Sequence, residues 1–265
     1  MDWLQALILA LIQGLTEFLP VSSSAHLILL PELLGWPDQG LTFDVAVHLG
    51  TLLAVLAYFR RTVARLIADW GQSLARRQPV GESGLAWYVI IATIPVVLAG
   101  LVLGDLAESC LRGALVIAAT TVGFGLVLWW ADRYTGGVRE EGQIGLRDAL
   151  VIGGAQVLAI VPGTSRSGIT ITAGLMLGMT PSAAARFSFL LSMPTIALAG
   201  AWRGLELAQN PEAVDLGLLA LGMVVSAAAA YLCIGAFLAL LARVGLGPFI
   251  AYRLVLGALL LVIFL

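Results

Sequence analysis

The chain has 265 residues, of which 60% are hydrophobic and only 11% are charged, and its formal net charge is −2. Soluble domains carry roughly 25% charged residues, so this composition excludes a soluble globular protein and fits the lipid bilayer as solvent. The apolar runs are continuous and do not alternate with polar residues, which also excludes an outer-membrane β-barrel. The sequence therefore predicts an all-α polytopic membrane protein, folded as a single membrane-embedded domain over residues 1–265.

The chain begins with an apolar region, residues 3–34, that a polar loop breaks near its middle, and residues 146–179 form a second region of this kind. The pieces beside the first loop, such as 3–15 and 24–34, are too short to cross a bilayer alone. We therefore expect two re-entrant helix–loop–helix segments, each entering and leaving on one side of the membrane. Their loops would be buried in protein or line a wet cavity.

A spanning helix needs roughly 20 mostly apolar residues. Six further segments meet this requirement, and they are 43–59, 85–103, 113–131, 184–201, 216–241 and 248–265. Between the first two of them, the arginine-rich segment 60–80 with Trp70 is typical of an amphipathic helix on the membrane surface. The expected fold is thus six transmembrane helices plus the two re-entrant segments.

The positions of the arginines predict the orientation, because loops rich in basic residues remain in the cytoplasm. Ten arginines, most of them in the loops 60–84 and 132–147, fall on one side, whereas Arg112 and Arg203 fall on the other. The first side is therefore expected to be cytoplasmic. Both termini would then lie outside, with an even number of spans between them.

With this orientation, the first broken region enters the membrane from outside and the second enters from inside, which is typical of an inverted-topology repeat. The segments 91–100 and 191–200 are also similar to each other and support a repeat. We expect the two halves, about 1–110 and 146–241, to form one intertwined domain, followed by the final helix. The two loop tips would meet near the bilayer midplane.

The two loops have related sequences. Each has a glutamine, then a proline and a serine-rich turn, and the residues of interest are Gln13, Glu17, Ser22, Ser23, Ser24 and His26 in the first loop and Gln156, Gly163, Thr164, Ser165, Arg166, Ser167 and Gly168 in the second. Arg166 presents a planar fork of donors suited to phosphate oxygens. Each turn precedes a helix, and free N–H groups at helix starts bind anions. Gly163 and Gly168 would let the backbone approach a ligand closely. The loops therefore predict an anion site, with phosphate as the natural ligand.

Glu17 and His26 add proton-transfer capacity, and a neighbouring serine hydroxyl could be activated as a nucleophile. A carboxylate near phosphate can also hold Mg²⁺ or Ca²⁺, so Glu17 is the candidate metal ligand. The simpler alternatives are that the serine turns are only helix caps and that the Arg–Glu pair is structural. Two related loops that carry an acid, a base, a hydroxyl and a guanidinium favour a functional site. Outside them, we interpret His48 as a buried or interfacial histidine, and expect Arg253 to pair with a carboxylate or with carbonyls.

The first loop resembles the (Glu/Gln)-x-x-x-Glu motif and serine-rich loop of the undecaprenyl-diphosphate phosphatases of the bacitracin-resistance type, as distinct from the type-2 phosphatidic acid phosphatases. Residues 162–168 resemble that family's Pro-Gly-x-Ser-Arg-Ser-Gly motif, and the similarity extends to 187–191 and 248–253. The resemblance implies a bacterial inner-membrane hydrolase that removes the terminal phosphate of the C55 polyprenyl diphosphate. The product would be the monophosphate lipid carrier of peptidoglycan synthesis. Bacitracin resistance, dependence on Mg²⁺ or Ca²⁺ and access from the periplasm belong to the same implication.

By this resemblance, Glu17 matches the second acidic position of the motif, Ser23 the proposed nucleophile, His26 the motif histidine and Arg166 the phosphate-binding arginine. The remaining polar and glycine residues of the two loops, Gln13, Ser22, Ser24, Gln156, Gly163, Thr164, Ser165, Ser167 and Gly168, are expected to bind substrate. Gln13 is uncharged, so no role that needs a charge at the first motif position applies to this chain. Ala25 stands where many members of the family have glycine. Thr164 occupies the variable position of the second motif.

Two alternatives stay open at this point. In the chemistry, Ser23 attacks the terminal phosphorus while Glu17 or His26 manages protons, or else Glu17 or His26 activates water directly. In function, a polyprenyl-phosphate transporter or flippase is the rival, because inverted repeats with broken helices are a transporter architecture. A flippase needs an anion site but no nucleophile. We expect lipid partners and no nucleic acid, and a homodimer is an option that the sequence leaves open.

Overall fold

The computed structural model describes residues 1–209 and 215–265, apart from the side chains of Asp105, Glu108 and Ser109. Within this part of the chain the backbone is helical and has no β-strand, so the predicted all-α class is confirmed. The elements are α1 (Trp3–Thr16), α2 (Ser23–Leu34), α3 (Leu41–Tyr58), α4 (Arg60–Arg76), α5 (Ser83–Cys110), α6 (Ala114–Tyr134), η1 (Glu141–Gln143), α7 (Leu146–Gln156), η2 (Val157–Ile160), α8 (Arg166–Met176), α9 (Pro181–Gln209), α10 (Leu216–Val244) and α11 (Gly247–Phe264).

Six of the described helices are long and apolar enough to cross a membrane, and they are α3, α5, α6, α9, α10 and α11. These are the six predicted spans. The largest differences are at the ends of α5 and α9, which continue past the predicted boundaries 103 and 201 to Cys110 and Gln209. A helix does not have to end where its apolar stretch ends, so hydropathy marks the apolar stretch and not the helix ends.

The two broken regions form short helices, as their interruptions predicted. Residues 17–22 separate α1 from α2, and η2 with the turn that follows it separates α7 from α8. Both α2 and α8 begin at serine N-caps, Ser22 and Ser165, with positive φ angles of 73° and 71°. Neither region contains a helix among those able to span a bilayer. The loops therefore lie where the sequence placed them.

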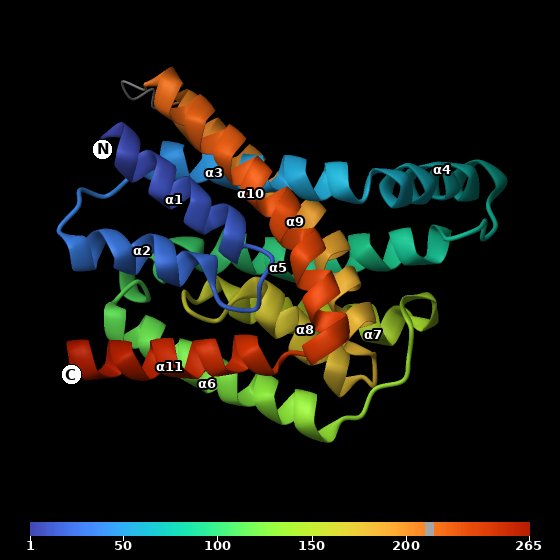
Figure 1. The fold of residues 1–265 in the computed structure, drawn as a ribbon. Helices are drawn as coiled ribbons and strands as arrows, with labels where there is room; N and C mark the ends of the chain where they lie inside the picture. The colour runs from blue at the N-terminus through green and yellow to red at the C-terminus, as the bar shows by residue number, and fades with distance from the viewer. Residues whose placement is uncertain (210–214) are drawn as a thin grey trace.

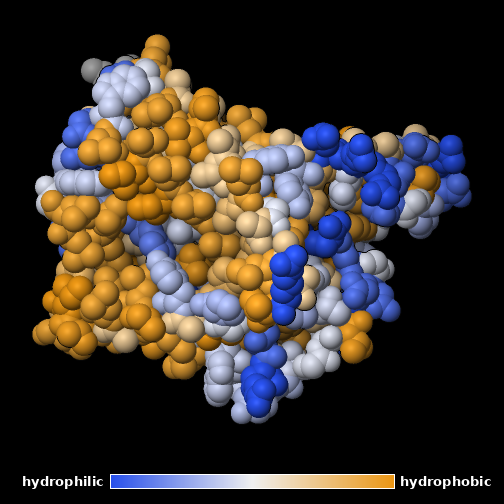
Figure 2. Space-filling model, in the orientation of Figure 1, coloured by the Kyte–Doolittle hydropathy of each residue, from blue (hydrophilic) through white to orange (hydrophobic). Residues whose placement is uncertain are grey.

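The arrangement of the helices puts both termini at the same end of the molecule (Figure 1). The helix α4 and the connection between α6 and α7 lie at the opposite end, and hydrophilic residues gather there around an otherwise apolar body (Figure 2). The helix α4 follows α3 directly and packs against α5, where Trp70 and Trp87 make an edge-to-face contact with ring centroids 5.7 Å apart. The predicted amphipathic helix is thus present as one arm of a hairpin with α5.

An aromatic cluster fixes the first loop to the centre of the bundle. Phe18, just after Glu17, packs edge-on against Phe189 of α9 with ring centroids 5.3 Å apart, and Phe237 of α10 lies 5.8 Å from the same Phe189 ring. All three side chains are buried, and in a bilayer it is van der Waals packing of this kind, more than removal from water, that holds helices together. This packing holds the residue next to Glu17 in place and so positions the polar residues of the loop.

Candidate active site

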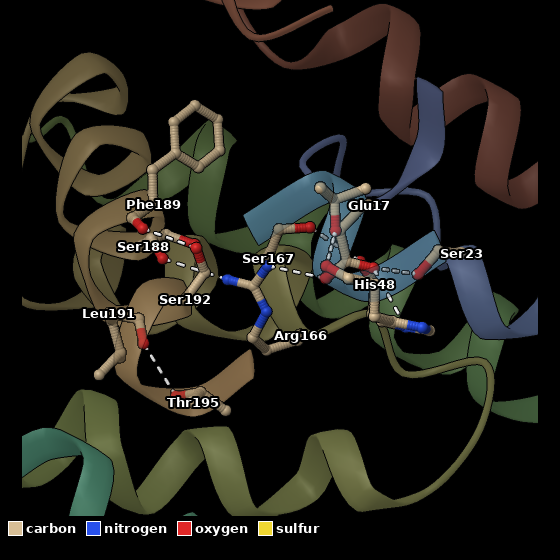
Figure 3. Close-up of polar contacts among 12 residues, drawn as sticks. Glu17, Ser23, His48, Arg166, Ser167, Ser188, Phe189, Leu191, Ser192 and Thr195 are labelled. Carbon is tan, nitrogen blue, oxygen red and sulfur yellow. Dashed lines mark hydrogen bonds and ion pairs between the residues drawn. The ribbon is translucent and has the colours of Figure 1, made fainter. Parts of the chain in front are cut away.

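The two loops contact each other inside the bundle. The Ser167 hydroxyl, at the start of α8, donates a hydrogen bond to the Leu19 carbonyl of the first loop over 2.7 Å. Arg166 Nη2 donates to Glu17 Oε1 over 3.0 Å, so an ion pair also joins the loops. Figure 3 shows Arg166 and Glu17 pointing toward one another from their separate elements. The expected contact between the two loop tips is therefore present.

Glu17 accepts hydrogen bonds on both of its carboxylate oxygens. Ser23 Oγ donates to Oε2 over 2.7 Å, and Gln13 Nε2 donates to the same oxygen over 3.0 Å from one turn earlier. The Glu17 side chain is only 7% exposed, and a buried carboxylate is stable when it is paired and hydrogen-bonded in this way. A hydroxyl held this closely against a carboxylate can pass its proton to it. Glu17 is thus placed to act as the base for Ser23.

Arg166 is held by the protein on two sides. Besides Glu17, its Nη1 donates to the Ser188 carbonyl of α9 over 3.1 Å, and its guanidinium carbon lies 5.9 Å from the centre of the Phe18 ring. A guanidinium has five N–H donors, and these bonds use two of them. The remaining donors have no hydrogen-bond partner among the described residues, so they can bind phosphate oxygens without breaking the ion pair to Glu17.

Two of the loop serines act as helix caps, as the simpler alternative proposed. Ser22 Oγ accepts from the Ala25 amide over 3.4 Å, and Ser165 Oγ accepts from the Gly168 amide over 3.1 Å. Each hydroxyl satisfies one of the free N–H groups at the start of its helix. Ser23 is different, because its hydroxyl points to a carboxylate and makes no cap.

The other two serines, Ser24 and Ser167, lie two residues after the cap serines. Ser24 is exposed and its Oγ is 3.2 Å from that of Ser22. Ser167 is buried, and its Oγ is 3.2 Å from that of Ser165 while also bonding the first loop. Ser24 is therefore open to a ligand, whereas Ser167 holds the two loops together.

The two glycines of the second loop make room for protein atoms. A Cβ at Gly163, where φ is +87°, would collide with the Thr120 hydroxyl and the Ile117 carbonyl of α6. A Cβ at Gly168 would lie 2.7 Å from Arg253 Nη1. The absence of side chains at these glycines thus allows close packing of the loop against α6 and α11, and their contact with a ligand stays a prediction.

Gln156 and Thr164 are fully buried, each with one polar atom that has no partner among the described residues: Gln156 Nε2 and Thr164 Oγ1. Gln156 Oε1 accepts a long hydrogen bond of 3.5 Å from Thr195 of α9. Gln13 differs from its counterpart Gln156 in bonding Glu17. The related positions of the two loops thus have different surroundings.

The two histidines of the chain lie on different sides of the site. His26 bonds the Ser22 carbonyl through Nδ1 and Tyr252 Oη through Nε2, at 2.7 and 2.6 Å, and no hydrogen bond joins it to the Glu17 carboxylate. His48 of α3 places Nε2 3.9 Å from Glu17 Oε2, while its Nδ1 bonds the Asp44 carbonyl (Figure 3). His48 therefore borders the site, and only its tertiary position reveals this.

Arg253 of α11 is the second site residue whose position the sequence left open. It is fully buried, and the prediction that it bonds carbonyls is confirmed. Its guanidinium donates to the Pro20 carbonyl of the first loop over 3.2 Å and to the Gly163 and Thr164 carbonyls of the second over 3.0 Å. Arg253 thus fastens both loops to α11. The sequence signals it in two ways, as an arginine inside an apolar run and as the last residue of the segment 248–253 that resembles the family.

The site does not fit a divalent cation held by protein side chains alone. Among the described residues, no group of three or more His, Cys, Asp or Glu side chains could hold a metal. Mg²⁺ and Ca²⁺ need six or more ligands, mostly oxygens. Glu17 is the single carboxylate at the loop contact, and its oxygens already accept bonds from Gln13, Ser23 and Arg166.

Comparison with known proteins gives a match along the whole chain. The family model described as "Bacitracin resistance protein BacA" matches residues 6–259. A protein of Stutzerimonas stutzeri named undecaprenyl-diphosphatase 2 is 58% identical over 267 residues, which cover 100% of this chain and 99% of the relative. A protein named undecaprenyl-diphosphatase from Nitrosococcus oceani is 57% identical, and the match covers 100% of this chain and 100% of the relative. Another of the same name from Chromohalobacter salexigens is 56% identical, and the match covers 99% of each.

Proposed function

Because this chain belongs to the bacitracin resistance protein BacA family, we propose that it is an undecaprenyl-diphosphatase, which hydrolyses undecaprenyl diphosphate to the monophosphate lipid carrier and inorganic phosphate. Relatives that carry this name match it over essentially their whole length at 56–58% identity. The observation in the structure that carries the proposal is the contact of Ser23 with Glu17, beside Arg166. This set provides a nucleophile, a base and a phosphate ligand in one place.

The reaction proceeds in two displacements in this proposal. First, Ser23 Oγ attacks the terminal phosphorus and gives its proton to Glu17, while the bond from that phosphorus to the bridging oxygen breaks and releases the lipid monophosphate. Water then attacks the phosphoserine, the bond from phosphorus to Oγ breaks, and Ser23 regains a proton as inorganic phosphate leaves. The free donors of Arg166 stabilise the charge on the transferred phosphoryl group, which is the main demand of phosphoryl transfer.

The decisive experiment measures phosphate release from a long-chain polyprenyl diphosphate by the purified protein. Wild type is expected to turn over, while Arg166→Ala and Glu17→Ala lose at least about 100-fold in kcat. A phosphorylated Ser23 trapped by rapid acid quench would support the covalent route. A folded Ser23→Ala variant with near-normal turnover would exclude it in favour of water activated by Glu17. Substrate binding without any phosphate release would instead favour the transporter alternative.

We propose further that any divalent cation in the reaction enters with the diphosphate and is not resident on the protein. Diphosphate oxygens can supply the hard oxygen ligands that Mg²⁺ and Ca²⁺ require. Bound to the diphosphate, the cation would neutralise part of the negative charge of the phosphate groups. The protein residues orient the diphosphate, and Glu17 is the single carboxylate that could face the cation once it has released a hydrogen-bond donor.

The proposed topology has both termini in the periplasm of a bacterial inner membrane and the two loops as re-entrant segments of an inverted repeat. Three observations support it: the basic ends of the helices lie opposite the termini, the two loops share their cap geometry, and the first helix of each half packs against a helix of the other half. These packings are α1 on α10 and α7 on α5.

Labelling of single cysteines at either terminus by an impermeant maleimide in intact spheroplasts tests the orientation. A homodimer stays a prediction.

A further inference from the structure

The motif histidine has a partner from the far end of the chain that the proposed mechanism does not yet use. His26 Nε2 lies 2.6 Å from the hydroxyl oxygen of Tyr252 in α11, and the two rings are almost parallel, with an angle of 9° and centroids 5.8 Å apart. His26 Nδ1 lies 2.7 Å from the Ser22 carbonyl oxygen. The imidazole is therefore held on both sides.

These bonds decide which nitrogen carries the proton. A carbonyl oxygen only accepts hydrogen bonds, so His26 Nδ1 must carry a hydrogen. In the neutral ring Nε2 is then the acceptor, and the Tyr252 hydroxyl is its donor. Both nitrogens of His26 point to other partners, and the Ser23 hydroxyl donates to Glu17 Oε2 and not to His26. The base for the attack by Ser23 is Glu17, which leaves His26 and Tyr252 for another task.

The position of the pair indicates this task. Ser23 and His26 are three residues apart in α2, and side chains with this spacing lie next to each other on one face of a helix. Ser23 marks the terminal phosphorus that is attacked, so His26 and Tyr252 lie one helical turn further from the loop tips. The second, lipid-linked phosphate of the substrate is the group that reaches this point.

The molecular surface is hollowed between α2 and α11, the helices that carry His26 and Tyr252. In Figure 2, a stripe of hydrophilic residues crosses the apolar face in a hollow between the places of α2 and α11 in Figure 1. Tyr252 is 46% exposed, whereas its neighbour Arg253 is fully buried and fastened to both loops. The buried arginine thus fixes the position of the exposed tyrosine relative to the site, at the edge where an isoprenoid tail can pass into lipid.

We propose that Tyr252 is a further residue of the hydrolysis site, and that with His26 it binds the lipid-linked phosphate, which is the leaving group. When this phosphate is bound, His26 carries a second proton and Nε2–H donates to Tyr252 Oη. The tyrosine O–H is then free to turn and donate to a phosphate oxygen as the bridging bond breaks. The one covalent change in the pair is the N–H bond that forms at His26 Nε2, with a proton taken up from solvent at the exposed edge beside Tyr252. This inference rests on the proposed function. It assigns protein ligands to the lipid-linked phosphate, whereas the two-displacement mechanism above assigns them only to the terminal phosphate.

Product inhibition separates the two phosphate positions. The substitution Tyr252→Phe keeps the ring stacked on His26 and removes only the hydroxyl. We expect kcat to fall about tenfold and the inhibition constant of the polyprenyl monophosphate to rise about tenfold, since one hydrogen bond to a charged group is lost. The inhibition constant of inorganic phosphate, which binds at Arg166, should stay within about twofold. A residue that only supported the fold would weaken both products.

Matched variants complete the design. Tyr231→Phe is the control, because this tyrosine of α10 is also half-exposed and contacts Tyr58, and it should behave as wild type. His26→Gln, which leaves α11 untouched, should also weaken the monophosphate selectively. The double variant His26→Gln/Tyr252→Phe should bind the monophosphate little more weakly than either single variant, because the effects of substitutions within one hydrogen-bonded pair are not additive.

Unchanged monophosphate inhibition in folded Tyr252→Phe, or equal weakening of both products, would overturn the inference. Failure of the wild type to release phosphate would instead overturn the proposed function itself.

Discussion

Ser22 and Ser165, which lie in opposite halves of the chain, cap their helices in the same rare backbone conformation. Their φ angles are 73° and 71°, their hydroxyls accept a bond from the amide three residues later, and each Oγ lies 3.2 Å from the Oγ of the serine two residues on. The same number of residues separates Gln13 from Ser22 and Gln156 from Ser165. Such agreement in detail is what a duplicated segment predicts.

This shared conformation predicts an unusual order of stabilities. At Ser165 the left-handed backbone costs roughly 1–2 kcal/mol for any residue with a Cβ, and the cap hydrogen bond offsets this cost. Ser165→Ala loses the bond and keeps the strain, whereas Ser165→Gly loses both. We therefore expect thermal unfolding in detergent to give the Gly variant a higher Tm than the Ala variant. Equal values would show that the strain is not borne by this residue.

Glu17 should be the most sensitive residue for turnover. Glu17→Gln keeps the size of the side chain but removes the base next to Ser23 and the partner of Arg166, so kcat should fall by about 100-fold or more. Gln13→Ala removes only a neutral donor to the same carboxylate and should cost much less. Phosphate release at saturating substrate measures both, and an equal loss in the two variants would contradict the assignment of Glu17 as base.

Arg253 should affect stability as well as activity. Arg253→Met leaves the Pro20 and Thr164 carbonyls without this donor, and each buried acceptor without a partner costs about 1–3 kcal/mol. The Gly163 carbonyl would keep only a long bond of 3.4 Å from the Thr121 hydroxyl. The loops would loosen, so both Tm and kcat should fall. Arg166→Lys, in contrast, keeps a positive charge beside the buried Glu17 and should lower kcat with a smaller change in Tm, because it loses mainly the planar fork of donors to phosphate. The ratio of the two effects distinguishes the arginine that holds the loops from the one that holds the substrate.

A surface ion pair at the start of α7 gives a pH prediction away from the site. Arg139 donates to both carboxylate oxygens of Asp148, over 3.1 and 2.6 Å, and these hydrogen bonds lower the pKa of that carboxyl. The stabilisation is therefore complete above the pKa of an unfolded Asp, about 3.9, and is lost as the pH falls through the lower folded-state value. Tm of wild type should drop faster than that of Asp148→Asn in this window. Arg139→Met should flatten the profile in the same way.

The sequence predicted the helical elements well because the bilayer leaves few solutions. A long apolar run must be helical to satisfy its backbone, so the six spans followed from hydropathy. The breaks near Glu17 and Arg166 were visible because polar groups are costly in apolar surroundings. What hydropathy could not give was the length of α9, since polar residues extend a helix beyond the membrane.

Pairings between distant segments could not be predicted from local patterns. The contact of Glu17 with Arg166 was inferred only in outline from the relation between the loops. The positions of His48 and Tyr252, which lie on α3 and α11, depend on how those helices pack. The same holds for the second loop, because only the tertiary structure shows that α6 occupies the space beside Gly163.

The uncharged residue at the first motif position gives the last prediction. Gln13 Nε2 donates to Glu17 Oε2 over 3.0 Å, so Gln13→Glu would place two carboxylates against each other. Like charges at this distance are unfavourable unless a proton or a cation lies between them, and two carboxylates are the usual ligands of Ca²⁺ and Mg²⁺. We expect calorimetric titration without substrate to show no cation binding to wild type but measurable binding to Gln13→Glu. Gln156→Glu, which has no carboxylate beside it in the described structure, should bind none. Tight binding of Ca²⁺ or Mg²⁺ by the substrate-free wild type would show that the cation is resident on the protein.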